Sequence, residues 1–143
     1  MTARRSVDRW TCPRCDREFA RQQQSHACLP GGSVDESFAG RPPGQRAAYE
    51  AVVGHLRTLG PVHEDAVQVG VFLKRTRKLA EVRPKSKWVA LTIYLDRRID
   101  DPRIARTLQS SSTRTVHEVK LRDAGDVDVQ VLAWLTEAYE GAG

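Results

Sequence analysis

The three cysteines of this chain are the feature that most constrains how it can fold. Cys12, Cys15 and Cys28 all fall within seventeen positions of a 143-residue sequence, and His26 lies just before the last of them. A Cys-x-x-Cys knuckle directs two thiolates toward one metal ion, and a histidine with a further cysteine completes a ligand set typical of tetrahedral zinc. The pattern therefore predicts one zinc ion bound by Cys12, Cys15, His26 and Cys28.

Two other uses of these cysteines are less favoured. A disulfide would leave one of the three thiols unpaired. A thioredoxin-like motif needs a strand before it and a helix after it within a sizeable domain, and the Cys12/Cys15 pair lies near the N-terminus without that frame. Redox chemistry is thus the alternative to zinc at this pair. Because four protein ligands leave no coordination position for water, the predicted zinc is structural and not catalytic.

The spacing of His26 and Cys28 indicates the local backbone around the metal. Residues i and i+2 lie on opposite sides of a helix but on the same side of an extended strand. We therefore expect these ligands on a strand or turn. The familiar DNA-reading finger has three to five residues between its last two ligands, so this module is not expected to place a helix in the major groove.

Composition divides the chain into a small module and a larger body. Leu29-Pro30-Gly31-Gly32 is typical of a linker. The expected segments are a disordered tail at 1–9, a zinc-binding module at 10–29, a linker at 30–33 and an α+β domain at 34–143. No apolar run approaches the roughly 18 residues that span a bilayer. The N-terminus lacks the apolar region of a secretory signal, so a cytoplasmic location with reduced thiols is expected.

The body is predicted to form an antiparallel sheet packed with helices on one face, which is an α+β fold. Ser33 and Glu36 form a capping-box pattern at the start of a short helix. Trp88–Leu95 is rich in β-branched and aromatic residues, and its continuous apolarity predicts a central strand covered on both faces. Helices are predicted at 33–38, 43–59 and 126–140, with a further short helix within 100–109. Strands are predicted at 62–69, 71–73, 79–82, 88–95 and 113–121.

The net charge of +5 is concentrated in two stretches. Residues 61–100 carry nine basic and five acidic residues, and residues 1–30 carry six and three. Clustered cations attract phosphates, although polar hairpin turns are equally basic on many proteins. The candidate nucleic-acid contacts are Arg14, Arg17, Arg21, Lys74, Arg75, Arg77, Lys78, Lys85 and Lys87. Arg114, Lys120 and Arg122 would extend this surface if their strand lies nearby.

These observations favour a non-enzymatic binding module that contacts nucleic acid or a ribonucleoprotein through its basic surfaces. One alternative is a protein–protein adaptor that docks through the zinc head, with Trp10 and Phe19 as anchors. A second alternative is an enzyme or small-ligand domain with a cleft near His117, Arg114 and Lys78. His117 lies on a predicted strand and could act as a general base, but no carboxylate or nucleophile is paired with it by spacing. A packed or hydrogen-bonded histidine is therefore the favoured interpretation.

Two parts of the chain also resemble known families. WTCPRCDREFARQQQSHAC resembles a short C2HC-type zinc-finger-like head, W-x-C-P-x-C-x-x-x-F…Q-x-H-x-C, with Asp16 where that head commonly has glycine. The stretches VDESFAG, LGPV, KLAEVRPKSKWVALTIYL, STRTVHEVKL and LAWLTEAY resemble the domain-of-unknown-function family 5655. The resemblance implies a zinc ion and a compact α+β body, and it implies no activity.

The zinc prediction is tested by the metal content of protein purified without added zinc. Elemental mass spectrometry should find one zinc per chain in the wild type and loss of that zinc in Cys15→Ser, because a thiolate ligand is removed. Metal-free protein with titratable thiols would contradict the prediction and redirect attention to redox chemistry at Cys12 and Cys15.

Overall fold

The computed structural model describes residues 10–11, 18–19 and 33–143. In the N-terminal part, β1 (Trp10–Thr11) pairs antiparallel with β2 (Glu18–Phe19), with Trp10 opposite Phe19. The predicted tail, most of the linker and all four predicted zinc ligands lie outside the described residues.

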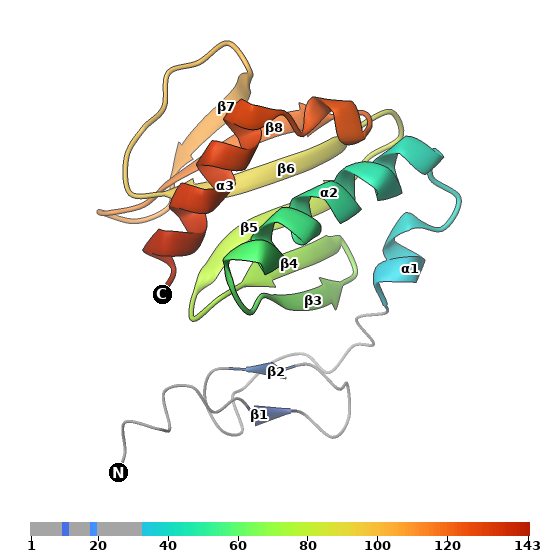
Figure 1. The fold of residues 1–143 in the computed structure, drawn as a ribbon, viewed down its shortest axis with the longest axis horizontal. Helices are drawn as coiled ribbons and strands as arrows, with labels where there is room; N and C mark the ends of the chain where they lie inside the picture. Colours follow the sequence, from blue (N-terminus) through green and yellow to red (C-terminus); the bar gives the residue numbers. More distant parts are fainter. Residues whose placement is uncertain (1–9, 12–17, 20–32) are drawn as a thin grey trace.

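A six-stranded, fully antiparallel sheet forms the body. Its strands are β3 (His63–Val67), β4 (Gly70–Lys74), β5 (Lys78–Pro84), β6 (Val89–Leu95), β7 (Ile104–Gln109) and β8 (Thr115–Leu121). The spatial order is β3-β4-β5-β6-β8-β7. Four strands therefore follow one another as a meander, and β8 then inserts between β6 and β7, which leaves β7 at the edge (Figure 1).

Helices pack on one face of this sheet, as predicted for the α+β class. α2 (Pro43–Leu59) and α3 (Val129–Gly141) lie side by side over β4, β5 and β6 (Figure 1). The short α1 (Val34–Phe38) precedes α2, and a single 3-10 turn, η2 (Ala124–Asp126), precedes α3. In the part of the chain that is described, no helix has both the length and the apolar character needed to cross a membrane.

The helix boundaries follow local chemistry that the sequence displays. The Ser33 hydroxyl accepts the backbone N–H of Glu36 at 3.1 Å, and the Glu36 carboxylate accepts the N–H of Ser33 at 2.8 Å. This is the predicted capping box, which satisfies two backbone donors reciprocally. α2 begins at Pro43 and ends at Leu59, as predicted, and Gly60 follows with a φ of 152°, a conformation that favours glycine.

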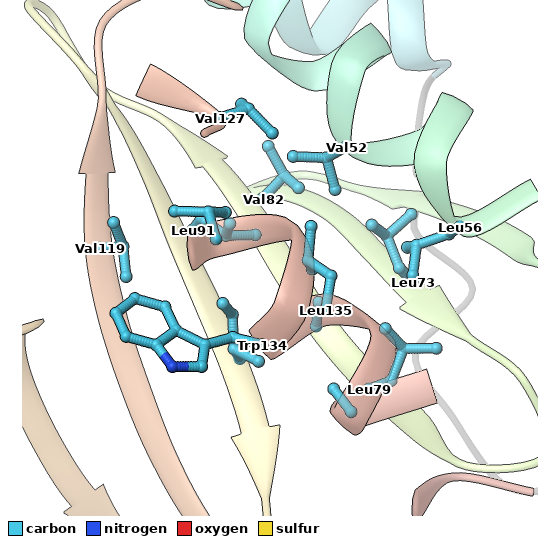
Figure 2. Close-up of a cluster of buried hydrophobic side chains, with 14 of the residues drawn as sticks. Val52, Leu56, Leu73, Leu79, Val82, Leu91, Val119, Val127, Trp134 and Leu135 are labelled. Carbon is cyan, nitrogen blue, oxygen red and sulfur yellow. The ribbon is translucent and has the colours of Figure 1, made fainter. Parts of the chain in front are cut away.

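The core lies between the helices and the covered face of the sheet. Leu91 of β6 is flanked by its cross-strand partners Val82 and Val119. Trp134 and Leu135 of α3 pack onto these side chains, while α2 packs onto β4 (Figure 2). Alternate residues of β4, β6 and β8 enter this core, because side chains alternate between the two faces of a strand.

One predicted element is wrong in type. Residues 100–109 were expected to include a short helix after Pro102, but Ile104–Gln109 is strand β7. A turn closed by the Ile104 N–H and the Asp101 carbonyl at 2.9 Å reverses the chain, and the following residues pair with β8. Pairing with the next strand of the chain thus overrides weak local helix preference.

Two predicted details also differ from the structure. β6 was expected to be covered on both faces, yet Thr92 and Tyr94 stay half-buried on the face opposite α3. The last helix begins at Val129 and not near Asp126, because the Asp128 carboxylate accepts the N–H of Val131 at 3.1 Å and caps the helix there.

Leu135 is fully buried, so its truncation should strongly destabilise the fold. Leu135→Ala should lower the free energy of unfolding by about 2–5 kcal/mol, because the truncation leaves a cavity under the sheet. Urea denaturation measures the change. The matched control is Val129→Ala on the same helix, where the side chain is 83% exposed and a change within about 0.5 kcal/mol is expected. Equal effects at both positions would contradict this packing.

Candidate functional site

The candidate site lies on the sheet face opposite α2 and α3, which we call the open face. Residues that pair across neighbouring strands share a face of the sheet, so the register of β5, β6, β8 and β7 arranges the outward side chains in three rows. The first row is Tyr94, Val116 and Leu108; the second is Glu81, Thr92, Glu118 and Arg106; the third is Arg83, Ala90 and Lys120.

These rows form the floor of a hollow of about 490 Å³. Besides most of the outward side chains of these rows, Lys85, Gln109 and Ser110 line the hollow. A volume of this size falls in the range of about 300–1,000 Å³ that small-molecule sites occupy. The open face therefore has the dimensions of a ligand site and a lining of mixed charge.

Glu81 anchors the charge network of the open face. Its carboxylate accepts the Tyr94 hydroxyl at 2.6 Å and lies 2.8 Å from both the Lys78 ammonium and an Arg83 guanidinium nitrogen. Burial alone would raise the pKa of Glu81, but the hydrogen bonds from Lys78 and Tyr94 outweigh it, and the pKa is lowered. Glu81 is consequently an ionised, fully compensated carboxylate and not a proton acceptor poised for catalysis.

Tyr94 lies between aromatic and cationic neighbours. The Arg114 guanidinium carbon is 4.8 Å from the centre of the Tyr94 ring, and the Lys78 ammonium is 4.2 Å from the centre of the Phe72 ring. Arg114 also donates to the Lys78 carbonyl at 2.8 Å. Burial, together with the hydrogen bond to Glu81, raises the pKa of Tyr94, so its phenol stays protonated at neutral pH.

Several of the predicted nucleic-acid contacts instead hold the fold together. Lys74 forms an ion pair with the buried Asp65 at 2.9 Å. Arg75 donates to the Tyr139 carbonyl at 3.0 Å, and Arg77 donates to the Gly141 carbonyl at 2.5 Å. The β4–β5 turn thereby binds the C-terminal end of α3, where basic groups interact favourably with free helix carbonyls.

Lys85 and Lys87, by contrast, are exposed, and neither forms an ion pair within the described residues. Of the two, Lys85 lines the hollow. The predicted contacts Arg14, Arg17 and Arg21 lie outside the described residues. Of the predicted contacts, Lys85 therefore supplies an exposed positive charge to the hollow.

The open face also holds cations that sequence reasoning missed or only suggested. Arg106 lines the hollow and has no carboxylate partner among residues 33–143. It was missed because its segment was predicted to contain a short helix, and residues 104–109 have no alternation of apolar and polar residues that would have indicated a strand. Lys120 was suggested as an extension, and its ammonium lies 4.4 Å from the centre of the Trp88 ring.

His117 lies on the covered face, where it is 1% exposed. Its Nε2 accepts the backbone N–H of Ile99 at 2.9 Å, which assigns the proton of the neutral ring to Nδ1. Burial lowers the pKa of His117, so the ring is neutral at physiological pH and packs as part of the core. Lys78 and Arg114 do lie together, but they lie on the other face of the sheet from His117.

Metal chemistry was predicted for the head and not for the body. Across residues 10–11, 18–19 and 33–143, no three His, Cys, Asp or Glu side chains cluster so that they would hold a metal ion. The prediction of zinc at Cys12, Cys15, His26 and Cys28 therefore stays a prediction from the sequence.

These features define a class of protein: an α+β domain with one helix-covered and one open sheet face. The model of the family DUF5655, a domain of unknown function, matches residues 34–142, and the chain belongs to that family. The resemblance of the body seen in the sequence is thus confirmed. No curated protein and no solved structure matches the chain.

The Glu81 network predicts a pH-dependent stability. Glu81→Gln should lower the free energy of unfolding at neutral pH, because it leaves Lys78 and Arg83 without their shared counter-charge. Folding lowers the pKa of this carboxyl group, so its contribution is present above the ordinary pKa and is lost as the pH falls through the lowered value.

Urea denaturation from about pH 7 to about pH 3 measures this contribution, since that range spans the titration of ordinary carboxylates. The difference between wild type and Glu81→Gln should shrink toward acid. Glu140→Gln, at an exposed position of α3, is the control and should show little difference at any pH. A Glu81→Gln difference that does not vary with pH would contradict the assigned role.

Proposed function

We propose that this protein is a non-enzymatic binding module whose open face contacts single-stranded nucleic acid, free or within a ribonucleoprotein. One observation carries the proposal: two cations that have no carboxylate partner among residues 33–143 line a hollow that also has aromatic and apolar side chains. Lys85 follows β5 and Arg106 belongs to β7, while Tyr94 and Val116 belong to the first row of the same hollow.

The charge balance of the open face supports binding of phosphates. Two carboxylates line the hollow, Glu81 and Glu118. Glu81 is already compensated within the protein by Lys78 and Arg83. Lys85, Arg106 and the neighbouring Lys120 therefore outweigh the single carboxylate of Glu118. A local excess of cations is what attracts a phosphate backbone and makes its binding depend on salt.

The shape of the face favours a single strand over a duplex. Proteins that bind single strands combine a basic surface with aromatic rings on which splayed bases stack. Trp88 and Tyr94 are half-buried rings on or beside this face, with Lys120 over the first and Arg114 over the second. Each ring thus lies next to a cation, which matches the alternation of base and phosphate along a strand.

The chemistry of the face supports binding without a reaction. The Glu81 carboxylate is neutralised by its neighbours, and the raised pKa of Tyr94 keeps its hydroxyl protonated. His117 is buried on the opposite face. General acid–base catalysis needs a group whose pKa lies near the working pH and which reaches the substrate, and none of these three groups meets both conditions.

The zinc head is the second part of the proposal. Arg14, Arg17 and Arg21 follow or interrupt the cysteine knuckle in the sequence. We propose that the head, held by zinc at Cys12, Cys15, His26 and Cys28, adds a second basic contact beside the body.

The proposal is tested by fluorescence anisotropy with labelled single-stranded and duplex oligonucleotides of mixed sequence. The full chain should bind the single strand more tightly than the duplex, and affinity should fall between about 50 and 200 mM salt. Lys85→Gln with Arg106→Gln should weaken binding and reduce the salt slope by about 0.7 for each lost phosphate contact.

Arg41→Gln is the matched control, because Arg41 is an exposed cation between α1 and α2, away from the residues that line the hollow. It should leave the salt slope close to that of the wild type. Weak binding that is independent of salt, or equal losses in the control and the double variant, would overturn the assignment to the open face.

A further inference from the structure

The hollow on the open face has two chemically different ends. Arg83 of the third row and the adjacent Lys85 make one end cationic. The first row, Tyr94, Val116 and Leu108, makes the other end aromatic and aliphatic. Along β6 these ends are four residues apart, from Ala90 to Tyr94, which is about 13 Å of strand.

We infer that this hollow binds a single nucleotide, with its phosphate at the Arg83 and Lys85 end and its base at the Leu108 end. The inference rests on the proposed function and specifies the unit of the strand that is recognised. A nucleotide is amphipathic in the same sense as the hollow, since a doubly or singly charged phosphate is joined through a sugar to a flat ring.

The phosphate end has two cations, Arg83 and Lys85, of which only Arg83 is held by an ion pair among the described residues. Arg83 is tied to Glu81, with contacts of 2.8 and 3.1 Å to one carboxylate oxygen, and is therefore held in position. Lys85 is exposed and has no ion-pair partner in the part of the chain that is described. A positioned guanidinium together with a free ammonium suits a phosphate group, because guanidinium groups offer forked donors and lysine adds a mobile charge.

The base end exposes apolar surface that a ring would cover. Leu108 is 58% exposed although it is a large aliphatic residue on a strand, and Val116 and Tyr94 beside it are half-buried. Covering such surface is favourable by about 25 cal/mol per Å². Gln109 and Ser110 line the same end, and the Gln109 amide donates to the Ser111 carbonyl at 3.0 Å, which leaves its oxygen as an acceptor for a base edge.

Glu118 fixes the direction in which a nucleotide lies. It belongs to the middle row, between the two ends. Its carboxylate accepts a hydrogen bond from a sugar hydroxyl. Arg106 lies opposite Glu118 in the same row and offsets its charge, whereas Arg83 and Lys85 leave the third-row end cationic. The phosphate is therefore directed to the third row and the sugar to the second.

The test is an NMR titration of the full chain with adenosine 5′-monophosphate, with adenosine and inorganic phosphate as separate probes. The mononucleotide should shift the methyl signals of Leu108 and Val116 and the amide signals near Arg83 and Lys85. Phosphate should shift only the second group, and each half should bind more weakly than the whole.

Leu108→Ser should lower the affinity for the mononucleotide about fivefold and leave the affinity for phosphate unchanged, because roughly 1 kcal/mol of apolar contact is lost. The residue is exposed, so the fold should survive. Val129→Ser, at an 83% exposed position on α3, is the matched control. Glu118→Gln should raise the affinity for inorganic phosphate and reduce the preference for the mononucleotide over phosphate.

The outcomes separate this inference from the proposed function. Oligonucleotide binding without mononucleotide shifts at Leu108 and Val116 would overturn the inference and leave the proposed function standing. Mononucleotide binding without oligonucleotide binding would establish a site for a free nucleotide and overturn the proposed function. If the mononucleotide displaces the oligonucleotide from wild type, the same hollow holds a nucleotide of the strand. If neither the oligonucleotide nor the mononucleotide binds, both the proposed function and this inference are overturned.

Discussion

The one-sided burial of the sheet is the constraint on which the rest of this structure depends. α2 and α3 both pack on the face that carries Leu91 and Val119, and Leu135 is buried at their contact. A sheet face without a helix must be stabilised by its own side chains. Here this is achieved with an ion network around the buried Glu81 carboxylate and with cations over aromatic rings. The charged network and the open face thus both follow from the packing of α2 and α3 on a single face of the sheet.

This arrangement separates the cations of the chain into two groups. Lys74, Arg75 and Arg77 are adjacent in sequence to Lys78 but serve the fold through Asp65 and the end of α3. Lys85 follows β5, Arg106 belongs to β7 and Lys120 to β8, and all three are exposed. The sequence identified Lys85 together with the first group and suggested Lys120, whereas Arg106 joins them only through the strand register.

The degree to which the sequence predicted this structure follows from the range of the interactions involved. Ser33, Glu36 and Pro43 act within one helical turn, and the elements that they begin were predicted correctly. The residues of β7 become a strand through pairing with β8, to which residues 110–114 join them, and the pattern of residues 104–109 alone does not display that pairing. Arg106 was missed for this reason. His117 was expected to be packed or hydrogen-bonded, and it is buried with its Nε2 accepting the backbone N–H of Ile99.

The insertion of β8 between β6 and β7 has a consequence for the dynamics of the open face. β7 is an edge strand that pairs only with β8 in the described sheet, and most of its side chains are exposed. Edge elements with few buried contacts open at a lower free energy than the global unfolding transition. Arg106 and Leu108 are therefore carried by the least stable strand of the site, and an occupant of the hollow would slow amide hydrogen exchange in β7 while exchange in β6 stays governed by global unfolding.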